Sequence, residues 1–385
     1  MTEIPFNKPS LVGAEIEYIL EAIRIGQLSG DGVFTKRCNA IIEHMTGTDC
    51  ALLTHSCTAA LEMAAFLCNL QPGDEVIVPS YTFVSTANAI VLRGATPVFV
   101  DIDQNTLNMC PLATSRAVTG KTKAIFAVHY AGFPCDMDAL ADIAARHDLI
   151  LVEDAAQALG STYKGRPAGK LGHLGAFSFH ETKNIISGEG GALTINRPDL
   201  VERAEIIREK GTNRSRFVRG AVDKYSWVDV GSSYLPGELI ASFLLAQLER
   251  ADEILARRRS IVARYTEALA PLEAAGAARL PAPQTDAISN GHMFYLLLPN
   301  PVARTEFIAY MKSKGLVTPF HYVPLHSAPA GVLYGRVSGD MSVTNDIAAR
   351  LVRLPVYFEL RDDIELVISA VLEYFSATLR TQKVG

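Results

Sequence analysis

Two residues of opposite charge follow apolar segments of the sequence and could act together on one cofactor. Lys183 lies in the run Ser178–Asn184, and Asp154 closes the apolar run Leu149–Asp154. Pyridoxal phosphate (PLP) chemistry requires a lysine amine that holds the cofactor aldehyde as a Schiff base. It also requires a carboxylate that keeps the pyridine nitrogen protonated, so that the ring can accept electrons. Lys183 and Asp154 together therefore indicate PLP chemistry. Taken alone, Lys183 could be an ordinary surface lysine, and Asp154 could be an ordinary acidic helix cap.

A hydroxyl-rich segment could supply the donors that the cofactor phosphate needs. The run Thr54–Thr58 precedes the helical run Ala59–Ala65. The free amides and the positive dipole end of a helix start attract an anion, and Ser or Thr hydroxyls add hydrogen bonds. An ordinary helix cap is the alternative reading. For the cofactor ring, Phe83 could cover one face and Gln157 could donate to the phenolic oxygen, while an isolated aromatic residue is also typical of a core.

The elements that must position these residues alternate between strand-like and helical runs, which is typical of a mostly parallel sheet with crossover helices. Ligands of such sheets bind beyond the carboxyl ends of the strands, where Asp154, Ser178 and Lys183 fall. The predicted strands are Val76–Pro79, Pro97–Asp101, Ala124–His129, Leu149–Asp154, Ala176–Phe179 and Gly191–Ile195, and the predicted helices between them include Val84–Leu92 and Met137–Arg146.

The pattern changes from Pro236 onward to one long helical stretch that resembles a spine between two domains. Beyond it, Met293–Leu298 is strand-like and Thr305–Lys314 is helical. We therefore predict an α/β protein with a large cofactor-binding domain at residues 1–247 and a smaller α+β domain at residues 248–385.

Composition excludes several classes of protein. Of the 385 residues, 49% are hydrophobic and 20% are charged, with a formal net charge of −5, which argues against disorder and against a nucleic-acid surface. The sequence shows neither a cationic and apolar leader nor a run long enough to cross a membrane, so we expect a cytoplasmic protein. Its six cysteines show no Cys-x-x-Cys pattern, so we expect no metal site.

Together these motifs resemble the DegT-type sugar aminotransferases, a fold-type-I PLP family that acts on nucleotide-linked keto sugars. The most specific stretches are Glu153–Gln157, Ser178–Lys183 and Gly188–Gly191. The resemblance implies PLP that cycles through pyridoxamine 5′-phosphate, with Lys183 as the Schiff-base lysine and Asp154 as the pyridinium partner. It further implies that Phe83 stacks on the cofactor ring and that Gln157 lies near the ring oxygen. The phosphate contacts that it implies are Cys57, Thr58 and Ser178.

Three more segments resemble the family members that act on TDP-linked sugars: Ser80–Asn88, Arg208–Ser215 and Gly231–Leu235. This resemblance implies transfer of the amino group of L-glutamate to C4 of TDP-4-oxo-6-deoxy-D-glucose, with a galacto product for surface-glycan synthesis. It also implies a homodimer in which each subunit completes the other's site.

Two positions depart from the family pattern. Ser233 stands where many members have an asparagine that reaches the phosphate in the neighbouring subunit, and a serine hydroxyl is shorter. Cys57 stands where the family usually has glycine, so the backbone there must accept a residue with a Cβ, while its amide can still donate.

A basic stretch could meet the diphosphate of a sugar nucleotide, although a solvated loop is an equal alternative. Two histidines resemble residues at the rim of the family's site, and ordinary structural histidines are the alternative. The substrate-binding candidates are Arg214, Arg219, Lys224, His292 and His326.

Three rival functions remain at this point. A PLP dehydratase branch of the family has histidine in place of the Schiff-base lysine, and Lys183 argues against it. An aminotransferase that acts at C3, or one that makes the gluco epimer, would use the same catalytic residues. A PLP-binding sensor without catalysis is the alternative from another class.

Overall fold

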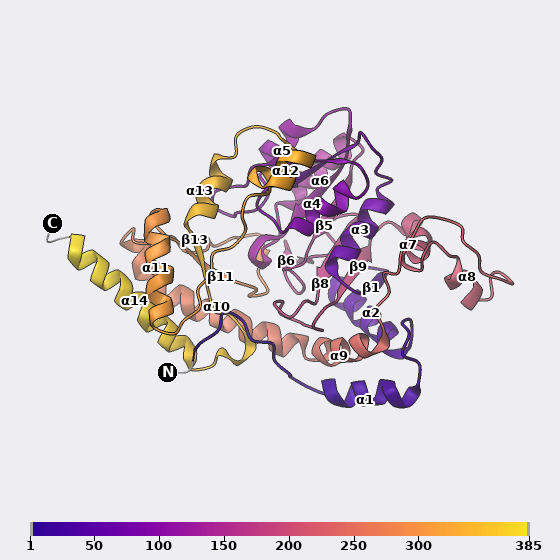
Figure 1. The fold of residues 1–385 in the computed structure, drawn as a ribbon, viewed down its shortest axis with the longest axis horizontal. Coiled ribbons are helices and arrows are strands. Elements are labelled where there is room, and N and C mark those ends of the chain that lie inside the picture. The colour runs from indigo at the N-terminus through magenta and orange to yellow at the C-terminus, as the bar shows by residue number, and fades with distance from the viewer. Residues whose placement is uncertain (1–2, 383–385) are drawn as a thin grey trace.

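The computed structural model describes residues 3–382, and its largest feature is one eight-stranded sheet (Figure 1). Seven of the eight strands run in the same direction, and β9 lies antiparallel between β1 and β8. This arrangement confirms the predicted mostly parallel α/β fold. The spatial order is β1 (Ala51–Thr54), β9 (Gly191–Ile195), β8 (Leu174–Ser178), β5 (Ile150–Asp154), β4 (Thr122–Val128), β2 (Glu75–Pro79), β3 (Thr96–Val100) and β12 (Arg336–Val337).

Helices cover both faces of this sheet, because successive side chains of a strand point to opposite faces. In β2, Val76 and Val78 lie in one apolar cluster, whereas Ile77 lies in another on the opposite face. The first cluster includes α3 (Cys57–Leu67), α4 (Val84–Val91) and α7 (Val201–Arg208); the second includes α5 (Pro111–Ala117) and α6 (Met137–Arg146). At the β1 end, α2 (Val33–Thr46) and α9 (Glu238–Glu249) share a further cluster, and α1 (Glu15–Ile25) packs against α9.

The long helix predicted from Pro236 onward is in fact two helices. It consists of α9 and of α10 (Ala251–Ala274), which meet at Arg250. Arg250 departs from helical geometry, with φ −108° and ψ 15°. The helix is therefore interrupted at Arg250, and Figure 1 shows α9 and α10 following one another from the large sheet to the second core.

A second apolar core lies beside the first and is built around two antiparallel strands, β11 (Phe294–Leu297) and β13 (Leu351–Leu354). It is covered by α10, α11 (Pro301–Ser313) and α14 (Asp363–Gln382), which lie together at the left of Figure 1. Ile4, from the start of the chain, joins this core through a bridge to Leu316. The domain boundary at residue 247 stays a prediction.

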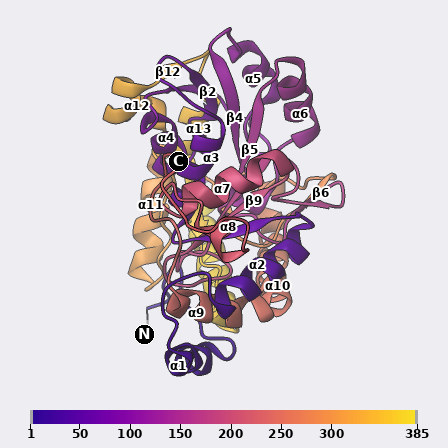
Figure 2. The same ribbon diagram turned by 90° about the vertical axis from the view of Figure 1, so that its right-hand side faces the viewer.

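The remaining elements are short. A three-stranded sheet contains β10 (Ala287–Ile288), β6 (Thr162–Tyr163) and β7 (Arg166–Pro167). Figure 1 shows α8 (Arg214–Val218) on an arm that projects away from the large sheet. In Figure 2, α12 (Pro329–Tyr334) and α13 (Ser342–Arg350) lie near the sheet edge formed by β12. Single 3-10 turns occur at Tyr130–Gly132, Pro198–Leu200, Leu325–Ser327 and Phe358–Leu360. Among residues 3–382, no helix combines the length and the apolar character that a bilayer crossing needs.

Candidate active site

A cavity of about 680 Å³ lies beyond the carboxyl ends of β4, β5 and β8, and part of its wall comes from β13. Its position agrees with the rule for ligands of open α/β sheets. The cavity brings together residues that are far apart in the sequence. Eight of the predicted site residues line it: Cys57, Thr58, Phe83, Asp154, Gln157, Ser178, Lys183 and His292.

Asp154 is buried at the end of β5 and is held by two hydrogen bonds. Thr86 Oγ1 donates to Oδ2 at 2.6 Å, and the amide of Ala156 donates to Oδ1 at 3.2 Å. Burial raises the pKa of the Asp154 carboxyl above its usual value, while these two bonds and the charge of Lys183 act to lower it. A cationic group bound beside Asp154 would favour the ionised carboxylate.

Lys183 reaches the same cavity from the turn that follows β8. Its amide donates to the carbonyl of His180 at 2.9 Å, which fixes the turn. Burial lowers the pKa of the Lys183 amine below its usual value, and the positive charge of Arg353 lowers it further, against opposing effects of Cys57 and Asp154. An amine with a lowered pKa is more often unprotonated, and therefore a better nucleophile and proton acceptor.

The start of α3 presents the expected anion donors at the cavity. Ser56 caps the helix by accepting from the amide of Ala59 at 3.1 Å, so Cys57 and Thr58 occupy the first turn. The hydroxyl of Thr58 lies 2.8 Å from that of Ser85, which also lines the cavity. Because helix-start amides and clustered hydroxyls bind phosphate, this donor set fits the phosphate of PLP.

Gly191 explains how the backbone at Cys57 can lie against β9. A Cβ on Gly191 would stand 2.3 Å from the carbonyl carbon of Ser56 and 2.4 Å from the amide nitrogen of Cys57. These distances are far below van der Waals contact, so only glycine permits this approach. The glycine that the close contact requires is thus on β9, while Cys57 itself sits in ordinary helix geometry.

The two residues expected beside the cofactor ring also lie at the cavity wall. Gln157 accepts from the amide of Ala131 at 2.8 Å and donates to the hydroxyl of Tyr322 at 2.7 Å. Phe83 is 56% exposed, and its ring centroid is 6.4 Å from that of Tyr322. Phe83 is therefore accessible to a ligand rather than enclosed in a core.

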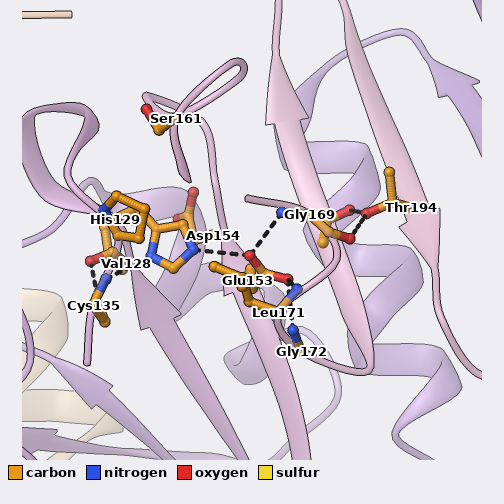
Figure 3. A network of polar contacts seen from close by, with 12 residues as sticks. Val128, His129, Cys135, Glu153, Asp154, Ser161, Gly169, Leu171, Gly172 and Thr194 are labelled. Carbon is orange, nitrogen blue, oxygen red and sulfur yellow. Dashed lines mark hydrogen bonds and ion pairs between the residues drawn. The ribbon is translucent and has the colours of Figure 1, made fainter. Parts of the chain in front are cut away.

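A buried polar network supports the end of β5 from behind (Figure 3). The amide of Cys135 donates to Nδ1 of His129 at 3.2 Å, which leaves the ring proton on Nε2, 2.9 Å from Oε2 of Glu153. Glu153 also accepts from three amides, at 2.7, 2.8 and 2.7 Å, those of Gly169, Leu171 and Gly172. With four donors on one carboxylate, the residue beside Asp154 has a fixed position.

The other predicted residues do not line the cavity of the single chain. Both terminal nitrogens of Arg219 bind Glu205, at 2.8 and 2.7 Å. Arg214 lies 3.3 Å from Glu209. Lys224 is exposed on the same arm.

Ser233 is exposed where the chain returns from that arm. His326 has its Nδ1 2.7 Å from the hydroxyl of Ser80 and does not line the cavity. His292 does line the cavity, with Nδ1 2.9 Å from Oδ1 of Asn184, and burial lowers its pKa well below the usual value. The roles of these residues stay predictions.

Several residues that line the cavity or support it were absent from the sequence prediction. Ser85 lines the cavity and Thr86 donates to Asp154; their spacing from Phe83 along a helix start is a signal that could have found them. Tyr322 and Arg353 come from the distant second core. No local pattern marks those two residues, because their place in the wall depends on tertiary packing.

Comparison with known proteins agrees with this geometry. The sequence model of the DegT/DnrJ/EryC1/StrS aminotransferase family matches residues 9–372. GDP-perosamine synthase of Caulobacter vibrioides is 34% identical over 378 residues, which are 96% of this chain and 98% of that protein. The crystal structure of DesV from S. venezuelae is 32% identical with a TM-score of 0.88, over 97% of this chain and 99% of that one. The aminotransferase TlmJ from Streptoalloteichus hindustanus is 31% identical with a TM-score of 0.89, over 98% and 100%.

Proposed function

The chain belongs to the DegT/DnrJ/EryC1/StrS aminotransferase family, whose members are PLP-dependent sugar aminotransferases, and from this premise we propose its substrates and product. The amino donor is L-glutamate, and the acceptor is C4 of TDP-4-oxo-6-deoxy-D-glucose. The products are 2-oxoglutarate and TDP-4-amino-4,6-dideoxy-D-galactose, which serves surface-glycan synthesis. The observation that carries the chemistry is the presence of Lys183 and Asp154 in one cavity with the start of α3. The choice of sugar rests on the resemblance of three sequence segments.

When bound, PLP supplies an aldehyde that exchanges amines and a ring that withdraws electrons from the reacting carbon. Lys183 would hold the aldehyde, and Asp154 would hold the proton on the ring nitrogen. Gln157 would meet the ring oxygen, and Phe83 would cover one ring face. The amides of Cys57 and Thr58 and the hydroxyls of Thr58 and Ser178 would bind the phosphate.

Lys183 is also the group placed to move protons. Burial and nearby positive charge favour its neutral amine, which can take a proton from the donor carbon. In the second half of the cycle the same amine, now protonated, can return the proton to C4 of the sugar. Because Lys183 acts from one wall of the cavity, the sugar face that meets this wall sets the configuration at C4.

We also propose a homodimer in which the projecting arm enters the site of the partner subunit. The arm places Arg214, Arg219, Lys224 and Ser233 outside the cavity of their own chain. It exposes a cluster of large apolar side chains, as expected of an association surface. These are Phe217, Val218, Tyr225, Trp227, Val228 and Val230. Light scattering tests the dimer: the native protein should have twice the mass of the chain, and Trp227→Asp should shift it toward the single chain.

One incubation tests the proposed substrates. The PLP-loaded protein is mixed with L-glutamate and TDP-4-oxo-6-deoxy-D-glucose, and the sugar product is identified by NMR. An axial amine at C4 supports the proposal. An equatorial amine at C4, or amination only of the isomeric 3-keto sugar, would retain aminotransferase chemistry and overturn the proposed product. If the protein aminated no keto sugar, the result would favour a PLP-binding sensor without catalysis.

A further inference from the structure

Arg353 is a cavity residue whose charge no carboxylate neutralises in the part of the chain that the structure describes. It lies in β13 and lines the cavity. Its Nε and Nη2 both donate to the carbonyl of Phe320, at 3.2 and 2.9 Å, and its guanidinium carbon lies 4.3 Å from the ring centroid of Phe6. The Phe320 carbonyl and the Phe6 ring, over which the guanidinium lies, hold this group without neutralising it.

The acidic residues of the cavity are engaged elsewhere. Asp154 accepts from Thr86 and Ala156, and Glu189 is exposed beside His180. Among the groups that act on Arg353, burial comes first and lowers its pKa, and the others are tyrosines. Its positive charge reaches the reaction centre, because it contributes to the lowered pKa of Lys183.

A second arginine on the cavity wall has a different use. Arg258 is buried, and its Nε and Nη2 donate to the carbonyls of Gly291 and His292, at 3.2 and 2.8 Å. It therefore fixes the backbone of the wall. Arg353 donates to one carbonyl through Nε and Nη2, and its Nη1 has no acceptor among the described residues. Keeping the Arg353 guanidinium charged and without a carboxylate partner in a partly desolvated cavity costs free energy. A bound anion would offset this cost, so the arrangement favours an anion-binding site.

We propose that Arg353 binds the α-carboxylate of the amino donor, an assignment that rests on the transamination proposed above. A planar guanidinium fits a carboxylate closely. The anion held by Arg353 must belong to a substrate whose reacting atom meets Lys183. In an α-amino acid the carboxylate is bonded directly to the reacting carbon. In a nucleotide sugar the diphosphate is attached at C1, across the ring from C4. The cofactor phosphate has its own donors at the start of α3.

Separate half reactions test this assignment. Arg353→Gln holoenzyme is mixed with L-glutamate alone, and the loss of the PLP absorbance band gives KM for the donor; L-alanine is tested in the same way. The reverse half reaction starts from the pyridoxal form and the TDP-linked amino sugar. We expect KM for both amino acids to rise about tenfold to a hundredfold, and KM for the amino sugar to stay within about twofold. Arg353→Lys should retain part of the donor affinity.

Binding of glutarate, which carries no amine and cannot react, gives a readout besides activity. Calorimetric titration of the holoenzyme should show weaker binding to Arg353→Gln than to the native protein. Arg279→Gln is the matched control, since Arg279 also donates to a backbone carbonyl, that of Gln104, but lies outside the cavity. The assignment would be overturned if Arg353→Gln left the donor KM and the glutarate affinity unchanged. It would also be overturned if KM rose equally for the amino acids and for the amino sugar. If the native holoenzyme bound glutarate through Arg353 but glutamate left its absorbance unchanged, the proposed function would fail and the anion site would stand.

Discussion

Thr86 and Asp154 are joined by a buried hydrogen bond in which the Thr86 hydroxyl donates to Oδ2 at 2.6 Å. Thr86 lies in the first turn of α4 and Asp154 ends β5, so the bond links a helix start to a strand end. Burial raises the pKa of the carboxyl, and this bond opposes that effect. Thr86 therefore helps to keep Asp154 in the ionised form that a pyridinium partner needs.

Thr86→Val should shift the pH dependence of the enzyme without abolishing activity. Loss of the donor raises the pKa of Asp154 further, so the carboxylate is protonated at a higher pH. The acid limb of the kcat/KM profile for glutamate should move upward by about one unit, since a hydrogen bond to a charged group contributes about 1.5 kcal/mol or more. Thr114→Val, which removes another buried hydroxyl far from the cavity, should leave the limb in place. An unmoved acid limb in Thr86→Val would refute this role.

The sequence predicted the part of the site that local rules govern. Asp154, Ser178 and Lys183 follow strand ends of one parallel sheet, and such ends meet at one edge whatever the detailed packing. The bounds of α6, Met137–Arg146, match those of the predicted helix and likewise follow from local pattern.

The other features of the fold and the site depend on packing between segments that are far apart in the sequence, so no local pattern predicts them. Arg353 enters the cavity because β13 pairs with β11 and because Phe6, from the start of the chain, lies beside it. The helix interruption at Arg250 has neither proline nor glycine to mark it. Ser233 is exposed, and its contact with a partner subunit stays a prediction.

Lys183→Ala should remove both the attachment of the cofactor and the proton transfer. Turnover should fall by at least about a thousandfold, because a positioned acid or base alone contributes about 10² to 10⁴. The absorbance of bound PLP should change to that of the free aldehyde. Lys164→Ala changes an exposed lysine that pairs with Asp138, and it should match the native protein in both measurements. Native turnover by Lys183→Ala would exclude this lysine as the catalytic amine.

Gly191→Ala should weaken PLP binding through the phosphate donors. The added Cβ would push the Ser56–Cys57 peptide away from β9, because its ideal position lies 2.4 Å from the Cys57 nitrogen. We expect at least about a tenfold higher Kd for PLP, equivalent to one lost hydrogen bond to a charged group. Fluorescence or absorbance titration of the apoprotein measures it. Gly120→Ala, where a Cβ meets no atom within 4 Å, is the control. Equal affinity of both variants would contradict the close-contact argument.

Glu153→Gln should destabilise the fold more than any change of an exposed acid. Each carboxylate oxygen of Glu153 accepts two donors: Oε1 those of Leu171 and Gly172, and Oε2 those of Gly169 and His129 (Figure 3). An amide group has only one oxygen, so in either orientation its NH₂ faces two N–H donors. No rotation of the glutamine relieves this conflict.

The expected loss in the free energy of unfolding is about 3 kcal/mol, because buried polar groups are left without partners in a region closed to water. A lower urea midpoint measures it. Glu202→Gln alters an exposed pair with Arg216 and should change the free energy of unfolding by less than about 0.5 kcal/mol. A loss for Glu153→Gln as small as that of Glu202→Gln would mean that the four donors find other acceptors. The position of Asp154 would then depend on Thr86 and Ala156 rather than on the network behind β5.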